Sequence, residues 1–278
     1  MTWFVFCAVL AAALLHAVWN AIVKTGTDKQ SAMLTMAVGQ SVIGLCLIPF
    51  VTTPNAETLM WVIASGVIHM VYQLFLGFAY ERGDLSRVYP IARGAAPLLV
   101  LGVSLAFALD PLTGLDKTGI IVLVVGIILM AQGVFSSGED RQLIPLALGS
   151  AVATAGYSVV DGLGARVMGD PFAYTAWLLM FAAVFYVPAI IALKGTAIVR
   201  VPLRQYGQGL IAGTASFSAY AIVVWAMTQA PIAQVTALRE TSILFAVFLG
   251  WFWFGDRMTR GKILAGMLIV AGVVLSRV

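Results

Sequence analysis

Residues 85–130 read LSRVYPIARGAAPLLVLGVSLAFALDPLTGLDKTGIIVLVVGIILM, and this segment decides the fold class. Two long apolar runs flank the connection DPLTGLD (110–116), which is long enough only for a turn. A helical run of about 20 apolar residues matches the hydrocarbon core of a bilayer. Because backbone groups in lipid must satisfy their own hydrogen bonds, and these runs are too long for barrel strands, the segment predicts two transmembrane helices joined by a tight turn.

The composition of the whole chain agrees with a membrane protein. Of the 278 residues, 61% are hydrophobic and 10% are charged, and the mean hydropathy is +0.99. A soluble protein is about 45–50% apolar and about 25% charged. So few charges cannot cover a globule of this size in water, which excludes a soluble enzyme, a nucleic-acid-binding protein and a disordered protein. The net charge of +4 comes from scattered Lys and Arg and suits an anionic membrane surface.

The same alternation of apolar runs and turns continues along the chain and predicts an all-α polytopic membrane protein with ten transmembrane helices. The connections are short, apart from a looser segment at 194–205. The first span lacks a basic leader, so we expect it to be retained and not cleaved as a signal peptide. The expected spans cover residues 3–24, 32–52, 58–80, 86–109, 117–135, 142–168, 171–194, 206–229, 231–253 and 259–277.

The two halves of the chain resemble each other. A shift of 146 residues, without gaps, places Arg93 on Arg239. A repeat of five helices, an odd number, must place its two copies in opposite orientations. We therefore expect two inverted repeats, residues 1–138 and 139–278, with a substrate near the midplane between them. The same shift aligns Leu98 with Leu244, Asp110 with Asp256, Thr113 with Thr259, Gly126 with Gly272 and Leu129 with Leu275.

Polar side chains recur on single faces of several expected spans. The first span carries His16 and Asn20 one turn apart, and the third carries His69 and Gln73 at the same spacing. Such groups are costly in lipid, so we expect them to converge on a shared interior that binds a small molecule. The alternative for each is an interhelical hydrogen bond that only holds the bundle together. The candidate substrate-binding residues are Arg93, Arg239, His69, Tyr89, Asn20, Trp19, Gln73, Tyr72, Tyr157, Ser158 and Tyr220.

Arg93 and Arg239 occupy corresponding positions in the two halves. Guanidinium groups bind carboxylate or phosphate-like oxygens through two parallel hydrogen bonds, so two of them near the midplane would form a clamp for an anion. The alternative is structural, in which each arginine neutralises a buried acid, with Glu240 and Asp161 as candidates. If transport is coupled to protons, the proton is expected on one of His16, His69, Asp161 and Glu240.

Three stretches of the chain resemble the ten-helix drug/metabolite transporter superfamily of the EamA-domain type. They are HAVWNAIVK (16–24), LSRVYPIARGAAPLLV (85–100) and FGDRMTRGKILAGMLIVAGVVL (254–275). The resemblance implies two inverted five-helix repeats around a central cavity lined mainly by helices 1, 3, 4, 6, 8 and 9. It also implies that the fifth and tenth helices are peripheral scaffold.

The sequence therefore predicts a secondary transporter, and not an enzyme, that moves a small organic metabolite by alternating access. The favoured substrate is anionic or zwitterionic, with a carboxylate, phosphonate or sulfonate. The alternatives are an exporter of neutral amino acids or aromatic compounds and, in another class, an intramembrane enzyme or a structural membrane protein. No HExxH motif and no glycine-rich loop ending in GK[ST] occurs, so we expect no metal and no cofactor.

We expect a multi-pass protein of a cell membrane, namely a bacterial inner membrane. The expected partners are the lipid bilayer and a small-molecule substrate, without nucleic acid, and the expected state is a monomer or homodimer. The distribution of Lys and Arg favours termini on the outside, whereas the family resemblance favours termini on the inside.

Overall fold

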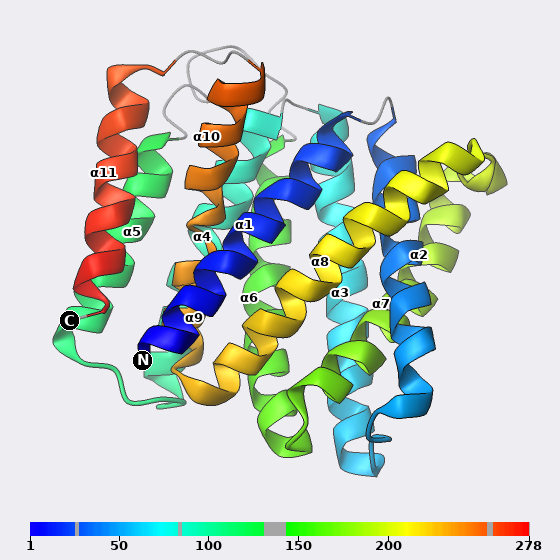
Figure 1. Ribbon diagram of the computed structural model, residues 1–278, viewed down its shortest axis with the longest axis horizontal. Helices are drawn as coiled ribbons and strands as arrows, with labels where there is room; N and C mark the ends of the chain where they lie inside the picture. Colours follow the sequence, from blue (N-terminus) through cyan, green and yellow to red (C-terminus); the bar gives the residue numbers. More distant parts are fainter. Residues whose placement is uncertain (26–27, 83–84, 131–142, 255–257, 278) are drawn as a thin grey trace.

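The computed structural model describes residues 1–25, 28–82, 85–130, 143–254 and 258–277. Within these ranges the chain forms eleven α-helices and two short 3₁₀ turns, without a β-strand. Both ends of the chain lie at the same end of the bundle (Figure 1), which agrees with the even number of spans that the sequence predicts. The helices are α1 (Trp3–Thr25), α2 (Lys29–Leu47), α3 (Ala56–Arg82), α4 (Leu85–Ala106), α5 (Gly114–Met130), α6 (Leu143–Met168), α7 (Pro171–Lys194), α8 (Leu203–Gln229), α9 (Ile232–Arg239), α10 (Ser242–Phe254) and α11 (Arg260–Leu275).

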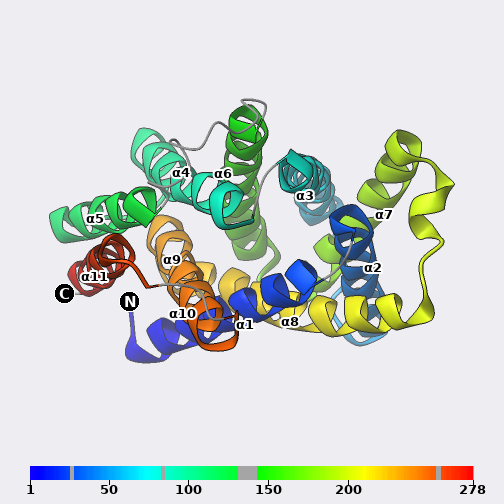
Figure 2. The same ribbon diagram turned by 90° about the horizontal axis from the view of Figure 1, so that it is seen from above.

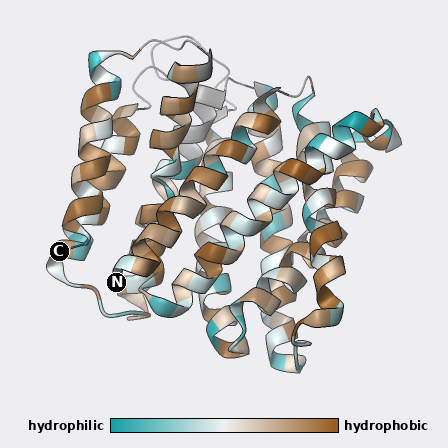
Figure 3. Cartoon of the chain, viewed as in Figure 1, coloured by the Kyte–Doolittle hydropathy of each residue, from teal (hydrophilic) through white to brown (hydrophobic). Residues whose placement is uncertain are grey.

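Seven segments of the described chain are long and apolar enough to cross a membrane, namely α1, α2, α3, α6, α7, α8 and the pair α9–α10. The apolar helices α5 and α11 have 17 and 16 residues, and the described apolar part of α4 begins at Arg93. For these three helices the crossing stays a prediction. Brown apolar residues run along the helices, whereas teal polar residues gather mainly at their ends (Figure 3). Large apolar side chains face outward, such as Ile211 with 63% of its surface exposed, as lipid allows.

The ninth expected span, 231–253, is not one continuous helix. α9 ends at Arg239 and α10 begins at Ser242, with Glu240 and Thr241 in a turn between them. The N–H groups of Glu240 and Thr241 donate to carbonyls three residues earlier, so the turn keeps its backbone paired. The chain therefore turns next to the adjacent charged residues Arg239 and Glu240, and the N–H groups of the turn still have partners within the membrane.

α5 and α11 lie side by side at one edge of the bundle (Figure 2). A Cβ atom on Gly272 would lie 2.4 Å from the backbone N of Leu123 and 2.6 Å from the carbonyl O of Gly119. The two backbones are therefore in direct contact, which only small residues permit. This agrees with the scaffold role that the family resemblance gives to the fifth and tenth spans.

An ion pair links the two halves at the end of the bundle where the termini lie. Arg166 of α6 donates to both carboxylate oxygens of Asp110, at 2.8 and 3.3 Å. Its guanidinium also donates to the carbonyls of Met227 and Ala230, at the end of α8. Asp110 in turn accepts from the backbone N of Ile232 at 2.8 Å, which caps the start of α9. The acid after the fourth span thus joins the α4–α5 connection to the corner between α8 and α9.

The remaining helices enclose a polar interior. α3 packs against α6, and α1 packs against α8. α4 packs against α6 and also contacts α9. The helices that the resemblance implied around a cavity, with α9 as the ninth, thus contact one another here, and Tyr174 of α7 also reaches this interior.

Candidate functional site

The polar interior collects the predicted residues of six helices. Nearly all of them are buried, whereas Tyr220 and His16 are half-buried. Tyr89 lies within α4, but its side chain falls outside the described part of the structure. The buried members are Trp19 and Asn20 of α1, His69, Tyr72 and Gln73 of α3, Arg93 of α4, Tyr157, Ser158 and Asp161 of α6, Arg239 of α9, and Glu240 in the turn after it.

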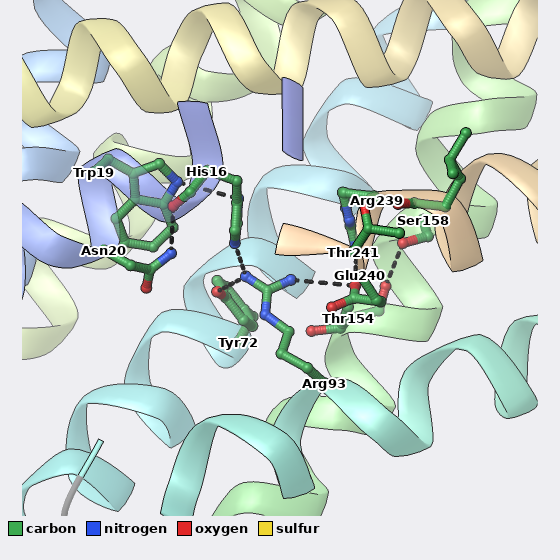
Figure 4. A network of polar contacts seen from close by, with 11 residues as sticks. His16, Trp19, Asn20, Tyr72, Arg93, Thr154, Ser158, Arg239, Glu240 and Thr241 are labelled. Atoms are coloured by element: carbon green, nitrogen blue, oxygen red, sulfur yellow. Dashed lines mark hydrogen bonds and ion pairs between the residues drawn. The ribbon is translucent and has the colours of Figure 1, made fainter. Parts of the chain in front are cut away.

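Arg93 reaches across the interior from α4 to three other parts of the bundle. Figure 4 shows its guanidinium between His16, Tyr72 and Glu240. Its Nη2 atom donates to the hydroxyl of Tyr72 at 3.2 Å and lies 2.5 Å from Nε2 of His16. Its Nη1 atom lies 3.5 Å from Oε1 of Glu240. Arg93 thus connects the first half of the chain to the break between α9 and α10.

Glu240 is shared by the two arginines. Its Oε1 atom also accepts from Nη2 of Arg239 at 3.2 Å. Arg93, Arg239 and Glu240 form a triad with two positive charges and one negative charge, all at most 2% exposed. Glu240 Oε2 and Arg239 Nε have no hydrogen-bond partner among the described residues. Both arginines thus contact the single carboxylate of Glu240, and the triad carries a net charge of one positive unit.

A second cluster surrounds Asp161 of α6, which is fully buried. Its Oδ2 atom lies 3.1 Å from Nε2 of His69 and also accepts from the hydroxyl of Tyr220. Its Oδ1 atom accepts from the hydroxyl of Tyr174 of α7 at 3.1 Å. Three donors from three helices therefore hold this carboxylate in place, which compensates its burial.

Stacked rings join the two clusters. The ring of Tyr157 stacks on that of His69, with 4.1 Å between centroids and 18° between planes. The guanidinium of Arg239 lies 5.7 Å from the centroid of the same Tyr157 ring. Tyr72 and Tyr220 meet Tyr157 edge-on. One tyrosine thus separates the positively charged triad from the negatively charged Asp161.

Several predicted residues bond mainly within their own helix. Trp19 Nε1 donates to Nδ1 of His16 at 3.1 Å, and Asn20 Nδ2 donates to the carbonyl of His16 at 2.7 Å. Ser158 Oγ donates to the carbonyl of Thr154 at 2.7 Å. The structure brings these side chains to the interior, but their direct hydrogen bonds are local.

Two further residues belong to the site: Tyr174, which the sequence did not indicate, and Thr154, which shares the polar face of Tyr157, Ser158 and Asp161 in the sequence. Tyr174 was missed because α7 is apolar along its length and shows no polar face. A Cβ atom on Gly164 of α6 would lie 2.7 Å from the Tyr174 ring, so this glycine makes room for the ring. Gly164 is therefore the one feature of the sequence that could have pointed to Tyr174. Thr154 faces Glu240 and Arg93 (Figure 4), and its Oγ1 atom is buried without a hydrogen-bond partner in the described structure.

A lipid-facing helical bundle with charged side chains at its centre is typical of polytopic membrane proteins that handle small solutes or ions. The comparison with family models names the family. Residues 142–278 match the EamA-like transporter family, so the second half of the chain belongs to it. This confirms the resemblance to the drug/metabolite transporter superfamily in the matched half, and together with the apolar helices it supports a multi-pass membrane protein.

Comparison with solved structures supports the fold. A crystal structure whose title reads "Crystal structure of protein" superimposes with a TM-score of 0.73. The match covers 99% of this chain and 96% of that chain at 17% sequence identity, so it bears on the fold alone. No curated protein matches the chain in sequence.

Proposed function

We propose that the chain is a secondary transporter that moves a small anionic or zwitterionic metabolite by alternating access. The proposal is carried by one observation, the pairing of two buried arginines, Arg93 and Arg239, with the single carboxylate of Glu240. The triad holds a positive charge in excess. This excess of positive over negative charge attracts anions, so the triad would bind the negative group of a substrate.

Two atoms of the triad favour a zwitterion. Glu240 Oε2 and Arg239 Nε are buried without hydrogen-bond partners in the described structure. Leaving such groups unpaired costs about 1–3 kcal/mol each. A zwitterion would offer acceptor oxygens to the guanidinium and an N–H donor to the carboxylate, so it would satisfy both. A simple anion would satisfy only the arginine.

The inverted repeat would supply the two states of the transporter. Gly119 faces Gly272, and Gly126 faces Ala265, across the contact between α5 and α11. The 146-residue shift places Gly119 on Ala265 and Gly126 on Gly272, so it converts one contact into the other. Such an exchange is expected when a two-fold axis in the membrane plane relates two antiparallel helices. It supports rocking of one repeat against the other, although the predicted boundary at 138–139 lies outside the described residues.

One observation favours the alternative substrates, which are neutral amino acids and aromatic compounds. The rings of Tyr72, Tyr157, Tyr220 and His69 gather beside the triad. Aromatic rings bind one another in edge-on or offset geometries, so an aromatic group on the substrate would find partners there.

A thermal-shift screen of the purified protein distinguishes these classes. The panel contains carboxylates, phosphonates, sulfonates and amino acids, each paired with its amide or ester, together with uncharged aromatic compounds. A substrate stabilises the folded state by RT ln(1 + [L]/Kd). We expect the acids to raise Tm and their uncharged derivatives to leave it unchanged, and uptake of the radiolabelled hit into proteoliposomes then gives transport and its direction. Stabilisation by uncharged aromatic compounds alone would contradict the anionic substrate.

The substitution Arg93→Lys tests the arginine pair. Lysine keeps the positive charge but loses the planar fork, so substrate affinity is expected to fall about tenfold or more, and substrate binding should weaken more than folding does. Arg204→Lys is the matched control, because Arg204 is exposed at the start of α8. Unchanged affinity in a folded Arg93→Gln variant would mean that the pair is structural.

A further inference from the structure

We propose that His16 takes up the proton that accompanies an anionic substrate, and that it does so by releasing Arg93. The inference rests on the proposed function, because it takes the anionic group of the substrate to bind the arginine pair. It identifies which of the four candidate groups, His16, His69, Asp161 and Glu240, couples substrate binding to protons.

The hydrogen-bond geometry of His16 sets this residue apart. Its Nδ1 atom faces the indole Nε1 of Trp19 at 3.1 Å, and its Nε2 atom faces Nη2 of Arg93 at 2.5 Å (Figure 4). Indole and guanidinium nitrogens only donate hydrogen bonds, whereas a neutral imidazole has one N–H group and one acceptor nitrogen. The ring can therefore accept from only one of its two neighbours at a time. Trp19 and Arg93 compete for the same acceptor.

The competition links the position of Arg93 to the protons on the ring. With its proton on Nδ1, His16 accepts from Arg93 at Nε2. With its proton on Nε2, it accepts from Trp19, and Arg93 must turn to another acceptor. With protons on both nitrogens it accepts from neither, and its positive charge repels the guanidinium. The doubly protonated ring thus makes Arg93 available to an anion.

The surroundings of His16 make its second proton depend on an anion. Arg93 of α4 contacts the ring, and the positive charge of Arg239 of α9 disfavours a second positive charge on it. Arg93 in turn contacts the hydroxyl of Tyr72 and the carboxylate of Glu240. A second proton would therefore place a third positive charge beside two arginines that share one carboxylate. A substrate anion supplies the missing negative charge and draws Arg93 away, so each ligand strengthens the binding of the other by the same factor.

The other three candidates are engaged in ways that do not depend on the contact between His16 and Arg93. Asp161 accepts hydrogen bonds from two tyrosines and lies against His69, so a proton on it would disrupt these contacts. His69 faces this carboxylate and not an arginine. A proton on Glu240 would leave two buried guanidinium groups without a counter-charge. His16 is therefore the candidate that gains a proton by giving up its contact with Arg93.

Because the chain contains two histidines, nitrogen NMR can follow each ring separately. The full chain, labelled with ¹⁵N in histidine, is placed in lipid nanodiscs without substrate, and His16→Gln and His69→Gln assign the signals. Nitrogen shifts report which ring nitrogen carries a proton. We expect both neutral tautomers of His16 in the unsubstituted protein. In Trp19→Phe, which removes the indole donor, we expect the proton on Nδ1 in most molecules, with the His69 signals unchanged as an internal control.

Substitution of Arg93 supplies the second arm. In Arg93→Gln, the fraction of His16 that carries two protons near neutral pH is expected to rise about tenfold, because a neighbouring positive charge is removed. Arg93→Lys keeps that charge and is the matched control, expected to show a much smaller rise. If Arg93→Gln does not fold, the Trp19→Phe comparison still decides whether two donors compete for His16.

A single tautomer of His16 that neither Trp19→Phe nor Arg93→Gln alters would overturn the proposal. So would an equal rise in the doubly protonated form in Arg93→Gln and Arg93→Lys. None of these measurements uses a substrate. A failed thermal-shift screen with a competing His16 would therefore count against the proposed substrate and not against the switch, whereas a positive screen with an inert His16 would count against the switch alone.

Discussion

The substitution Tyr174→Phe removes one hydroxyl from the buried cluster around Asp161. This hydroxyl also lies 3.4 Å from the carbonyl O of Trp61. Tyr174 is fully buried on α7, and its hydroxyl donates to Asp161 Oδ1 at 3.1 Å. The change removes the hydroxyl and leaves the ring in the space beside Gly164. A hydrogen bond to a charged group contributes about 1.5–3 kcal/mol. Because Asp161 keeps its contacts with Tyr220 and His69, we expect a loss near the lower end, about 1.5–2 kcal/mol.

Tyr186→Phe is the matched control on the same helix. Tyr186 is also fully buried, but its hydroxyl has no hydrogen-bond partner among the described residues. Removing a buried hydroxyl that makes no hydrogen bond relieves a desolvation cost. We therefore expect this variant to be neutral or more stable by up to about 1 kcal/mol.

The two variants are compared by reversible unfolding in mixed micelles with increasing SDS, followed by circular dichroism. Tyr174→Phe should have a free energy of unfolding lower than that of Tyr186→Phe by at least about 1 kcal/mol. Equal values would refute the reasoning, because they would mean that the hydroxyl of Tyr174 contributes no more to the folded state than one without a partner.

Two other substitutions test the scaffold in the same unfolding assay. Gly272→Ala should destabilise the protein by about 1–3 kcal/mol through overpacking, because its Cβ would lie 2.4 Å from the backbone N of Leu123. The control is Gly102→Ala, which has nothing described within 4 Å and should be neutral or stabilising. The opposite order of stabilities would contradict the close packing of α5 and α11. Arg166→Lys should lower the free energy of unfolding by about 1–3 kcal/mol, because an ammonium cannot replace a guanidinium that bonds a carboxylate and two carbonyls. A loss of stability no larger than in Arg204→Lys would show that this link is dispensable.

Much of the fold follows from hydropathy, because lipid leaves the chain few choices. Long apolar runs separated by short turns must become helices that cross and return, and the described helices follow that order. The break between α9 and α10 was not predicted. It occurs at Glu240 and Thr241, without glycine or proline, in a segment whose average hydropathy is that of an ordinary span. Hydropathy reports that a segment belongs in the membrane and does not report where its hydrogen bonds change.

The sequence predicts which polar helix faces form the site, but it does not predict which side chains on those faces contact one another. Ionisable groups cannot cheaply face lipid, so the polar faces that carry His16, His69, Asp161 and Arg93 had to point inward. Which groups meet depends on the rotation and depth of each helix, and one turn of α-helix changes the partner. The sharing of Glu240 by both arginines is set by such details of packing.

The distribution of charge inside the bundle bears on what can cross it. Among the described interior side chains, Arg93 and Arg239 balance Glu240 and Asp161 when both histidines are neutral. The balance is polarised, however, since the triad is positive and the Asp161 cluster negative. A bound zwitterion, with its anionic group at the arginines, leaves the total at zero. A bound anion makes the total negative unless a proton joins it, and His16 is placed to hold that proton. Because net charge is costly to keep within a membrane, the proposed transporter would move a zwitterion alone and an anion together with one proton.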